Sequence, residues 1–474
     1  MNRVLKVALL SGLAVTLAGC STVRGLLPFG LGQNNEPQAT ATEGQRISVL
    51  EFEQALVPSA ALSGRDFFIP GPQAATAWTQ PGGNAESAVE HVIAGAEFTV
   101  AWRRGVGAGS SRTRQVMAPV VADNGRVFVL DGEATVSALD AGTGAQAWRT
   151  SIKPAEGSRR GGFLGIGGRS DGGGGFGGGV AVGAGKVFVA SGYRTMTAID
   201  QASGAVIWTT PVDVPIHGAP TVSGSRVFVV DVENQIQAFD TATGRQDWSY
   251  RGIPEPARIM RASSPAVTGD TVIAPFSSGE VVALRASTGQ AVWQQVLSRA
   301  SRTSALSEIR DIAGRPVISR GVVYAVSHSG VLSAMDIRSG QPKWAPLPIA
   351  GVNAPLPVGD VVYVVSKEGE LTVINRETGQ VYWTRDLNEG RVRQEGGMFG
   401  LFDRTVRPIW SGPLMASNRL VLTNSDGELV AFDPRTGLQT ASLRLGGGPV
   451  YIAPAAYNGA LYVLTDKGDL VSIR

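Results

Sequence analysis

Few residues of this 474-residue chain stand in a pattern that supports covalent catalysis. The stretch Gly168-Arg169-Ser170-Asp171-Gly172 fits G-x-S-x-G, in which a nucleophilic serine must occupy a sharp turn between a strand and a helix. Here the serine lies in a glycine-rich segment, where composition alone produces such a match. The neighbouring Gly172 to Gly177 fits G-x-G-x-x-G for the same reason and lacks the βαβ context of a dinucleotide site. We therefore predict no catalytic residues.

Metal and redox chemistry have equally little support. The three histidines, His91, His217 and His328, share no ligand spacing such as H-x-x-x-H. The sole cysteine, Cys20, excludes an internal disulfide and any site built from several thiolates. We predict neither a metal nor a cofactor.

Charge argues against a nucleic-acid partner. The sequence pI is about 9.1, but the formal net charge is only +3 and no dense run of lysine and arginine occurs. An electrostatic footprint for phosphates needs such a cluster. Pairs such as Arg103-Arg104 are typical of solvated loops.

The residue type with the most regular spacing is tryptophan. Ala138-Leu139-Asp140, followed by Thr143-Gly144 and then Trp148, predicts two strands joined by a tight turn. The unit recurs with the tryptophans 60, 40, 45, 51 and 39 residues apart, and such a period is typical of a propeller or a solenoid. Because the tryptophan occupies the same position in each of these repeats, packing between repeats is favoured over an aromatic ligand site. The predicted girdle consists of Trp102, Trp148, Trp208, Trp248, Trp293, Trp344 and Trp383.

The elements that carry this unit predict an all-β fold. Each repeat contains four short strands, as a propeller blade does, and its second strand is almost continuously apolar, as in Val361 to Val365. A seventh copy has Ala441 in place of tryptophan, and an eighth begins at Leu470 just before the sequence ends. The unpaired strand Phe98 to Trp102 could complete that last blade. We predict an eight-bladed propeller of four-stranded antiparallel blades over residues 96–474, closed by an N-terminal strand.

The N-terminal region predicts export. Residues 1–19 combine Arg3 and Lys6 with an apolar run too short to cross a bilayer, as a signal peptide does. Leu17-Ala18-Gly19-Cys20 resembles a bacterial lipobox, which implies lipidation of Cys20 and an outer-membrane anchor facing the periplasm. We expect residues 20–44 to form a flexible tether and residues 45–95 an extended lead-in that wraps the domain. Two insertions, 157–179 and 386–410, are expected to be mobile surface loops.

The repeated Ala-x-Asp-x-x-Thr/Ser-Gly-x-x-x-Trp unit resembles the tryptophan-docking motif of the quinoprotein alcohol dehydrogenase-like propellers. One class with this fold comprises pyrroloquinoline-quinone dehydrogenases, which bind Ca²⁺ and of which many carry an adjacent cysteine pair. No such pair exists here. The other class is the BamB family, the B-type lipoproteins of the outer-membrane β-barrel assembly machinery. The lipobox, the tether and the missing catalytic set resemble this second class.

Local stretches also resemble the BamB family. Trp78 to Asn84 is similar to a lead-in of relatives. Three stretches are similar to the segment after the fourth-blade tryptophan, namely Trp293 to Gln295, Ser298 to Ala300 and Glu308 to Pro316. In that family a Leu-x-Leu-Arg segment and an acidic loop contact the periplasmic domains of the barrel subunit. The resemblance implies partner-binding roles for Arg261, Met260, Ile259 and Asp311, with Ala313 where a second aspartate is expected.

The sequence thus predicts a non-enzymatic scaffold with a lipid anchor. Its expected partners are the barrel-forming subunit, nascent outer-membrane proteins and the membrane, but no nucleic acid. A quinone-dependent dehydrogenase and a cell-envelope polysaccharide binder that uses the glycine-rich loop remain alternatives.

Overall fold

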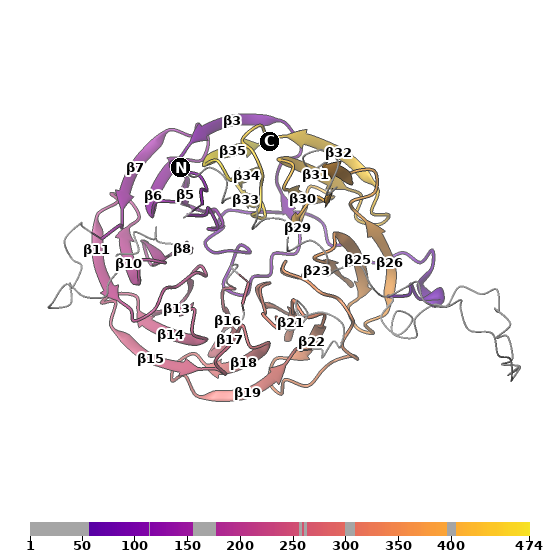
Figure 1. Ribbon diagram of the computed structural model, residues 1–474, viewed down its shortest axis with the longest axis horizontal. Coiled ribbons are helices and arrows are strands. Elements are labelled where there is room, and N and C mark those ends of the chain that lie inside the picture. The colour runs from indigo at the N-terminus through magenta and orange to yellow at the C-terminus, as the bar shows by residue number, and fades with distance from the viewer. Residues whose placement is uncertain are drawn as a thin grey trace, which may run out of the picture. The chain divides into compact units, whose positions relative to one another are not determined.

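The computed structural model describes residues 56–112, 114–154, 177–255, 258–259, 263–298, 309–395 and 404–474. Within these residues the regular elements are β-strands, apart from the 3-10 turn η1 (Ala60–Leu62). Eight sheets, each built on three or four antiparallel strands, stand around a common axis as the blades of a propeller (Figure 1). The predicted all-β fold is confirmed.

The blades are numbered in chain order, and their strands are as follows. Blades 1 and 2 contain β4 (Val121–Asp123), β5 (Arg126–Leu130), β6 (Thr135–Asp140) and β7 (Gln146–Ser151), then β8 (Gly178–Gly183), β9 (Lys186–Ser191), β10 (Thr195–Asp200) and β11 (Val206–Pro211). Blades 3 and 4 contain β12 (Thr221–Ser223), β13 (Arg226–Val230), β14 (Gln235–Asp240) and β15 (Gln246–Arg251), then β16 (Ala266–Thr268), β17 (Thr271–Pro275), β18 (Glu280–Arg285) and β19 (Ala291–Val296). Blades 5 and 6 contain β20 (Val317–Ser319), β21 (Val322–Val326) and β22 (Leu332–Asp336), then β23 (Leu356–Val358), β24 (Val361–Val365), β25 (Glu370–Asn375) and β26 (Val381–Asp386).

The last two blades include strands from the N-terminal part of the domain. Blade 7 contains β29 (Trp410–Ala416), β30 (Arg419–Asn424), β31 (Glu428–Phe432) and β32 (Gln439–Arg444), and its sheet is extended by β2 (Val92–Ile93) and β1 (Gln73–Ala74). Blade 8 contains β33 (Ala455–Tyr457), β34 (Ala460–Leu464), β35 (Asp469–Ile473) and β3 (Val100–Gly105). Because β3 pairs antiparallel with β35, the predicted closure by an N-terminal strand is confirmed.

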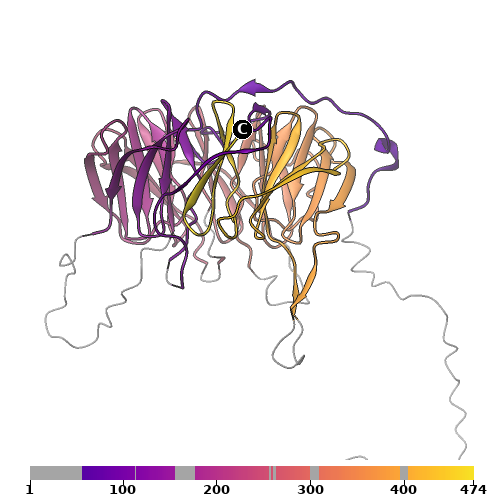
Figure 2. The same ribbon diagram turned by 90° about the horizontal axis from the view of Figure 1, so that it is seen from above.

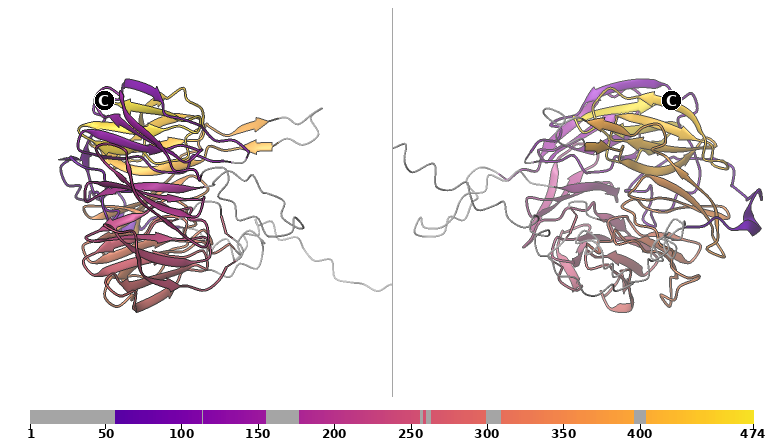
Figure 3. Two further views of the ribbon diagram at one scale, coloured as in Figure 1. Left: turned by 90° about the vertical axis from the view of Figure 1, so that its left-hand side faces the viewer. Right: turned by 45° about the vertical axis from the view of Figure 1, so that its right-hand side comes forward.

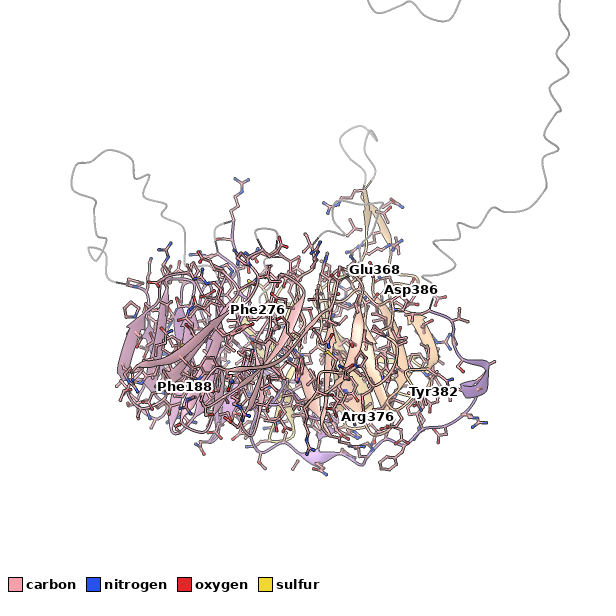
Figure 4. The ribbon with its side chains drawn as sticks, turned by 90° about the horizontal axis from the view of Figure 1, so that it is seen from below. Phe188, Phe276, Glu368, Arg376, Tyr382 and Asp386 are labelled. Atoms are coloured by element: carbon pink, nitrogen blue, oxygen red, sulfur yellow. The ribbon has the colours of Figure 1, made fainter. Side chains whose placement is uncertain are left out.

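The core lies between neighbouring blades. The middle strands bury both of their faces, as the fully buried β24 illustrates, because each sheet is covered by a blade on either side. Between blades 2 and 3, for example, Phe188 and Met196 pack with Ile216 and Phe239, all at 0% exposure. The apolar runs of the sequence therefore specify how each blade packs against its neighbours. Figure 4 shows the ring edge-on with its side chains and labels Phe188 of this cluster.

The repeated turn is held by its aspartate. Asp140 Oδ1 accepts hydrogen bonds from the backbone N–H and the hydroxyl of Thr143, at 2.8 Å each, and Gly144 follows at φ +69°. These bonds hold the pKa of the Asp140 carboxyl below its usual value. The same bonds recur at Asp200, Asp240, Asp336 and Asp433, and Asn375 makes them with its amide oxygen.

Each tryptophan of the repeat lies against the turn of the next blade. A Cβ built on Gly244 would come within 2.5 Å of Trp208 Cε3, so only glycine permits this approach. The indole N–H of Trp208 donates to the carbonyl of Thr241 in that turn, at 3.3 Å. Equivalent indole bonds are made by Trp102, Trp148, Trp248, Trp293 and Trp344. Trp383 packs on Gly437 in the same way, but its buried Nε1 has no hydrogen-bond partner.

Blade 5 departs from the predicted four strands. Its described part contains three strands, and the segment around Trp344 adds only isolated bridges, Leu332 to Leu347 and Met335 to Pro342. Pro342 and Pro346 lack the N–H that a ladder requires, so they interrupt the fourth strand. Trp344 nevertheless keeps its place, with 8% exposure and an indole bond to the carbonyl of Arg376.

Residues 56–98, here called the strap, run over one face of the ring (Figure 2). Between Trp78 and Gly95 the strap makes one circuit of the axis and hydrogen-bonds to every blade in turn, at or beside the first strand. The strap residues that make these bonds, for blades 1 to 8, are Trp78, Thr79, Gln80, Ala85, Glu86, Glu90, Val92 and Gly95. His91 adds a further fastening, because Nδ1 binds the carbonyl of Pro70 and Nε2 accepts from the N–H of Asn418.

A two-stranded ribbon projects from the opposite face (Figure 3). It consists of β27 (Arg393–Glu395) and β28 (Arg404–Val406), within the insertion expected to be a loop. Ion pairs fasten its base to blade 7, from Arg391 to Glu428 at 2.6 Å and from Arg393 to Asp426 at 2.7 Å. The segment 386–410, expected to be a mobile surface loop, therefore contains a paired ribbon, which its ladder and ion pairs fasten to blade 7. The other insertion lies mostly outside the described residues, at 155–176.

Candidate partner-binding face

The two stretches predicted to bind a partner meet on blades 4 and 5. Ile259 belongs to the connection that leads into β16, and Asp311 belongs to the connection that leads into β20. The backbone N–H of Ile259 donates to Asp311 Oδ2 at 3.2 Å. Met260 and Arg261 lie outside the described residues, as does Cys20. The fold thus joins residues 52 positions apart through one carboxylate.

Asp311 is a positioning residue in this geometry. Its side chain is only 4% exposed, so its carboxylate points into the protein instead of presenting a charge at the surface. Burial raises the pKa of Asp311 to about 7, although the Ile259 N–H, the Arg258 charge and the Ser277 hydroxyl each favour the ionised form. Asp311 thus holds the backbone at Ile259 through its carboxylate, and a contact between Asp311 and a partner stays a prediction.

Arg258 is a functional candidate that the sequence prediction did not include. It lines a small cavity of about 30 Å³ together with Asp311, His217 and Asp231. Burial, with a contribution from the positive charge of Arg258, lowers the pKa of His217 to about 4. Burial also raises the pKa of Asp231. The sequence feature that could have pointed to Arg258 is its position directly before Ile259.

The burial of Asp311 predicts a particular pH dependence of stability. The pKa rises from 3.8 to about 7 on folding, so the folded state binds the proton more tightly, and the free energy of unfolding falls as the pH increases from about 4 to 7. Asp311→Asn keeps an amide oxygen for Ile259 but cannot ionise. We expect wild type to lose stability relative to Asp311→Asn across this interval.

Urea unfolding at pH 4.5 and pH 8 measures this difference. Asp270→Asn is the matched control, because its side chain is 52% exposed. Parallel pH profiles for wild type and Asp311→Asn would contradict the assigned burial.

A central cavity of about 700 Å³ lies beside the segment that carries Ile259. Residues from all eight blades line it, among them Gly178, Ala313 and Pro413. Tyr451 and Ile409 are 39% and 51% exposed and mark the mouth, and Ile259 belongs to the same lining. Ile259, which is predicted to bind a partner, therefore borders this cavity.

The described residues hold no group of three or more His, Cys, Asp or Glu side chains that could bind a metal ion. Asp466 is the one carboxylate of the cavity lining as described, and it accepts a hydrogen bond from the Ser110 hydroxyl at 2.5 Å. Nor does the described part contain a helix long and apolar enough to span a membrane.

Comparison with known proteins decides the family. A sequence model described as outer membrane protein assembly factor BamB matches residues 88–159 and 132–385. The chain belongs to this family. BamB of Yersinia pestis is 31% identical over 247 residues, which are 52% of this chain and 60% of that protein. BamB of Escherichia coli strain K12 is 26% identical over 378 residues, which are 79% of this chain and 88% of that protein.

Several solved structures share the fold of this BamB-family chain. BamB from Moraxella catarrhalis superposes with a TM-score of 0.60 at 18% identity, covering 78% of this chain and 99% of that one. Quinohemoprotein alcohol dehydrogenase from Comamonas testosteroni also gives 0.60, at 15% identity, covering 84% of this chain and 80% of that one. Because the propeller is common to an assembly factor and an enzyme, the fold alone does not distinguish their functions.

Proposed function

We propose that this protein is a non-enzymatic scaffold of the outer-membrane β-barrel assembly machinery. In this proposal Cys20 is lipidated and anchors the chain to the outer membrane, with the propeller facing the periplasm. The segment Ile259 to Arg261 docks to the periplasmic domains of the barrel-forming subunit. Membership of the BamB family supports the general role, since its relatives are named as outer membrane protein assembly factors.

The observation that carries the docking surface is the bond between Ile259 and Asp311. It fixes the backbone at Ile259, immediately before Met260 and Arg261 in the sequence and beside the central cavity. An apolar side chain beside an arginine is typical of an interface anchor, because the two supply desolvated area and directional hydrogen bonds. A segment held at its base loses less conformational freedom on binding than a free loop does.

Nascent barrel proteins are the second proposed partner. The outer strands of the blades leave backbone groups available at their edges, and an extended chain can add a strand there. Apolar side chains stand exposed on two of these strands, with Val206 and Ile207 on β11 and Val292 and Val296 on β19, at 45–51% exposure. Such edges suit chains whose strands are not yet paired.

A complementation experiment tests the scaffold role. In a strain that lacks this protein, the wild-type gene should restore the level of folded outer-membrane barrel proteins, whereas Arg261→Glu should not, because the reversed charge repels the docking partner. Folded and unfolded forms are separated by heat-modifiable gel mobility. Arg285→Glu is the matched control, since Arg285 is 58% exposed at the end of β18 in blade 4. Full restoration by Arg261→Glu at equal abundance would count against this docking surface.

A further inference from the structure

The chain departs from its repeat directly after β15, the outer strand of blade 3. In six other blades the residue at this point donates its backbone N–H to the turn between the second and third strands, and its apolar side chain is buried or partly buried. These residues are Val106, Ile152, Val212, Leu297, Leu387 and Leu445. In blade 3 the residue is Gly252, whose N–H makes the same bond to the carbonyl of Asn234 at 2.8 Å. The residue that follows, Ile253, is 53% exposed.

Packing against blade 4 explains the glycine. A Cβ built on Gly252 would lie 2.8 Å from Cδ2 of Phe276, a side chain that is 1% exposed and labelled in Figure 4. The apolar side chain therefore comes one position later in blade 3, at Ile253, where it lies outside the core. At this later position the six other blades have only polar residues or glycine, namely Gly107, Lys153, Asp213, Ser298, Asn388 and Gly446.

Buried polar side chains fix the backbone of Ile253. Its N–H donates to Glu280 Oε2 at 2.6 Å, and its carbonyl accepts from Asn234 Nδ2 at 2.7 Å. Glu280 and Asn234 are only 1% and 2% exposed. Pro254 adds a further restriction, because a proline limits the backbone of the residue before it. A side chain on so fixed a backbone loses little conformational freedom when a partner covers it.

The proposed docking segment is fastened in the same way, six residues further along the chain. Ile259 donates its N–H to the carboxylate of Asp311, which is 4% exposed, as Ile253 does to that of Glu280. Both isoleucines belong to the connection between β15 and β16. One connection thus carries two isoleucines whose backbone is tied to a buried carboxylate, and this continuity indicates one interface.

We propose that Ile253 is a second apolar anchor for the partner that docks on Ile259 to Arg261. This inference rests on the proposed function, in which that partner is the barrel-forming subunit with its periplasmic domains. The partner surface opposite Ile253 is apolar, because an isoleucine side chain offers contact area and no hydrogen-bonding group. The docking surface then extends from the segment beside the central cavity to the end of β15.

Isothermal titration of the full-length protein, held in an amphipol, with the purified periplasmic domains of the barrel-forming subunit tests this role. We expect Ile253→Ala to weaken binding about tenfold, as truncation of an interface anchor does, and Ile253→Leu to bind nearly as tightly as wild type. Because Ile253 is exposed, both variants should keep the unfolding midpoint of wild type. Ile93→Ala is the matched control and should bind like wild type, since Ile93 is 45% exposed on the strap.

The outcomes separate this inference from the proposed function. If wild type binds, Arg261→Glu does not, and Ile253→Ala binds as tightly as wild type, the anchor role of Ile253 is overturned and the proposed function is not. If wild type does not bind the periplasmic domains, both are overturned. A photoreactive benzoylphenylalanine in place of Ile253 gives a second measurement in intact membranes. It should crosslink to the barrel-forming subunit, and a product with other proteins alone would overturn the assignment of the partner.

Discussion

Gly244→Ala is expected to destabilise the propeller by about 2–5 kcal/mol, whereas Gly224→Ala should cost only about 1–2 kcal/mol. Both glycines have left-handed backbones, with φ +72° and +58°, so both substitutions pay the conformational cost of an alanine there. At Gly244 the new Cβ also meets Trp208 Cε3 at 2.5 Å, whereas at Gly224 it meets nothing within 4 Å. The difference between the variants isolates the contact between blades 2 and 3.

Equilibrium unfolding in urea measures the two free energies. The clash must displace Trp208, which also donates its indole N–H to Thr241, so we expect the near-ultraviolet circular dichroism of Gly244→Ala to change as well. Equal losses of stability in the two variants would show that the tryptophan does not pack closely against the turn.

Trp78→Ala is expected to cost about 3–5 kcal/mol, the usual range for removing a buried tryptophan. Trp78 is 4% exposed, packs in the core cluster of blades 1, 7 and 8, and bonds through its backbone to Ala122. The variant enlarges the small cavity that Trp78 lines together with Gly82 and Val89 of the strap. Because the strap connects all eight blades, loosening it at Trp78 should lower the unfolding midpoint of the whole ring.

The matched control lies on the same strap. Phe68 is 59% exposed, so Phe68→Ala should change the free energy of unfolding by less than about 0.5 kcal/mol. Comparable losses in Trp78→Ala and Phe68→Ala would contradict the role of the strap as part of the core.

The repeat was predictable because its stabilising contacts are local or recur at one register. Asp140 and Thr143 form their turn within four residues, and the tryptophan follows at a fixed distance. Closure by β3 was also predictable, since the eighth repeat lacked a partner strand and Phe98 to Trp102 supplied one. Blade 5 shows the limit of this reasoning, because Pro342 and Pro346 interrupt a strand that the repeat pattern predicts.

A lead-in that wraps the domain was predicted, but the order in which the strap bonds to the eight blades could not be predicted. Its contacts with the blades are largely backbone hydrogen bonds, which leave no periodic pattern in the side chains. The burial of Asp311 was equally hidden, because its orientation depends on Ile259 and Ser277, which are distant in sequence. In both cases the decisive neighbours are brought together only by the closed ring.

Co-purification with the barrel-forming subunit tests the central claim most directly. The tagged full-length protein is isolated from detergent-solubilised outer membrane as wild type, Arg261→Glu and the control Arg285→Glu, and the bound proteins are identified by mass spectrometry. We predict that wild type and Arg285→Glu retain the barrel-forming subunit and that Arg261→Glu loses it while remaining folded. Recovery of no barrel-assembly component with wild type, or undiminished recovery with Arg261→Glu, would contradict the account.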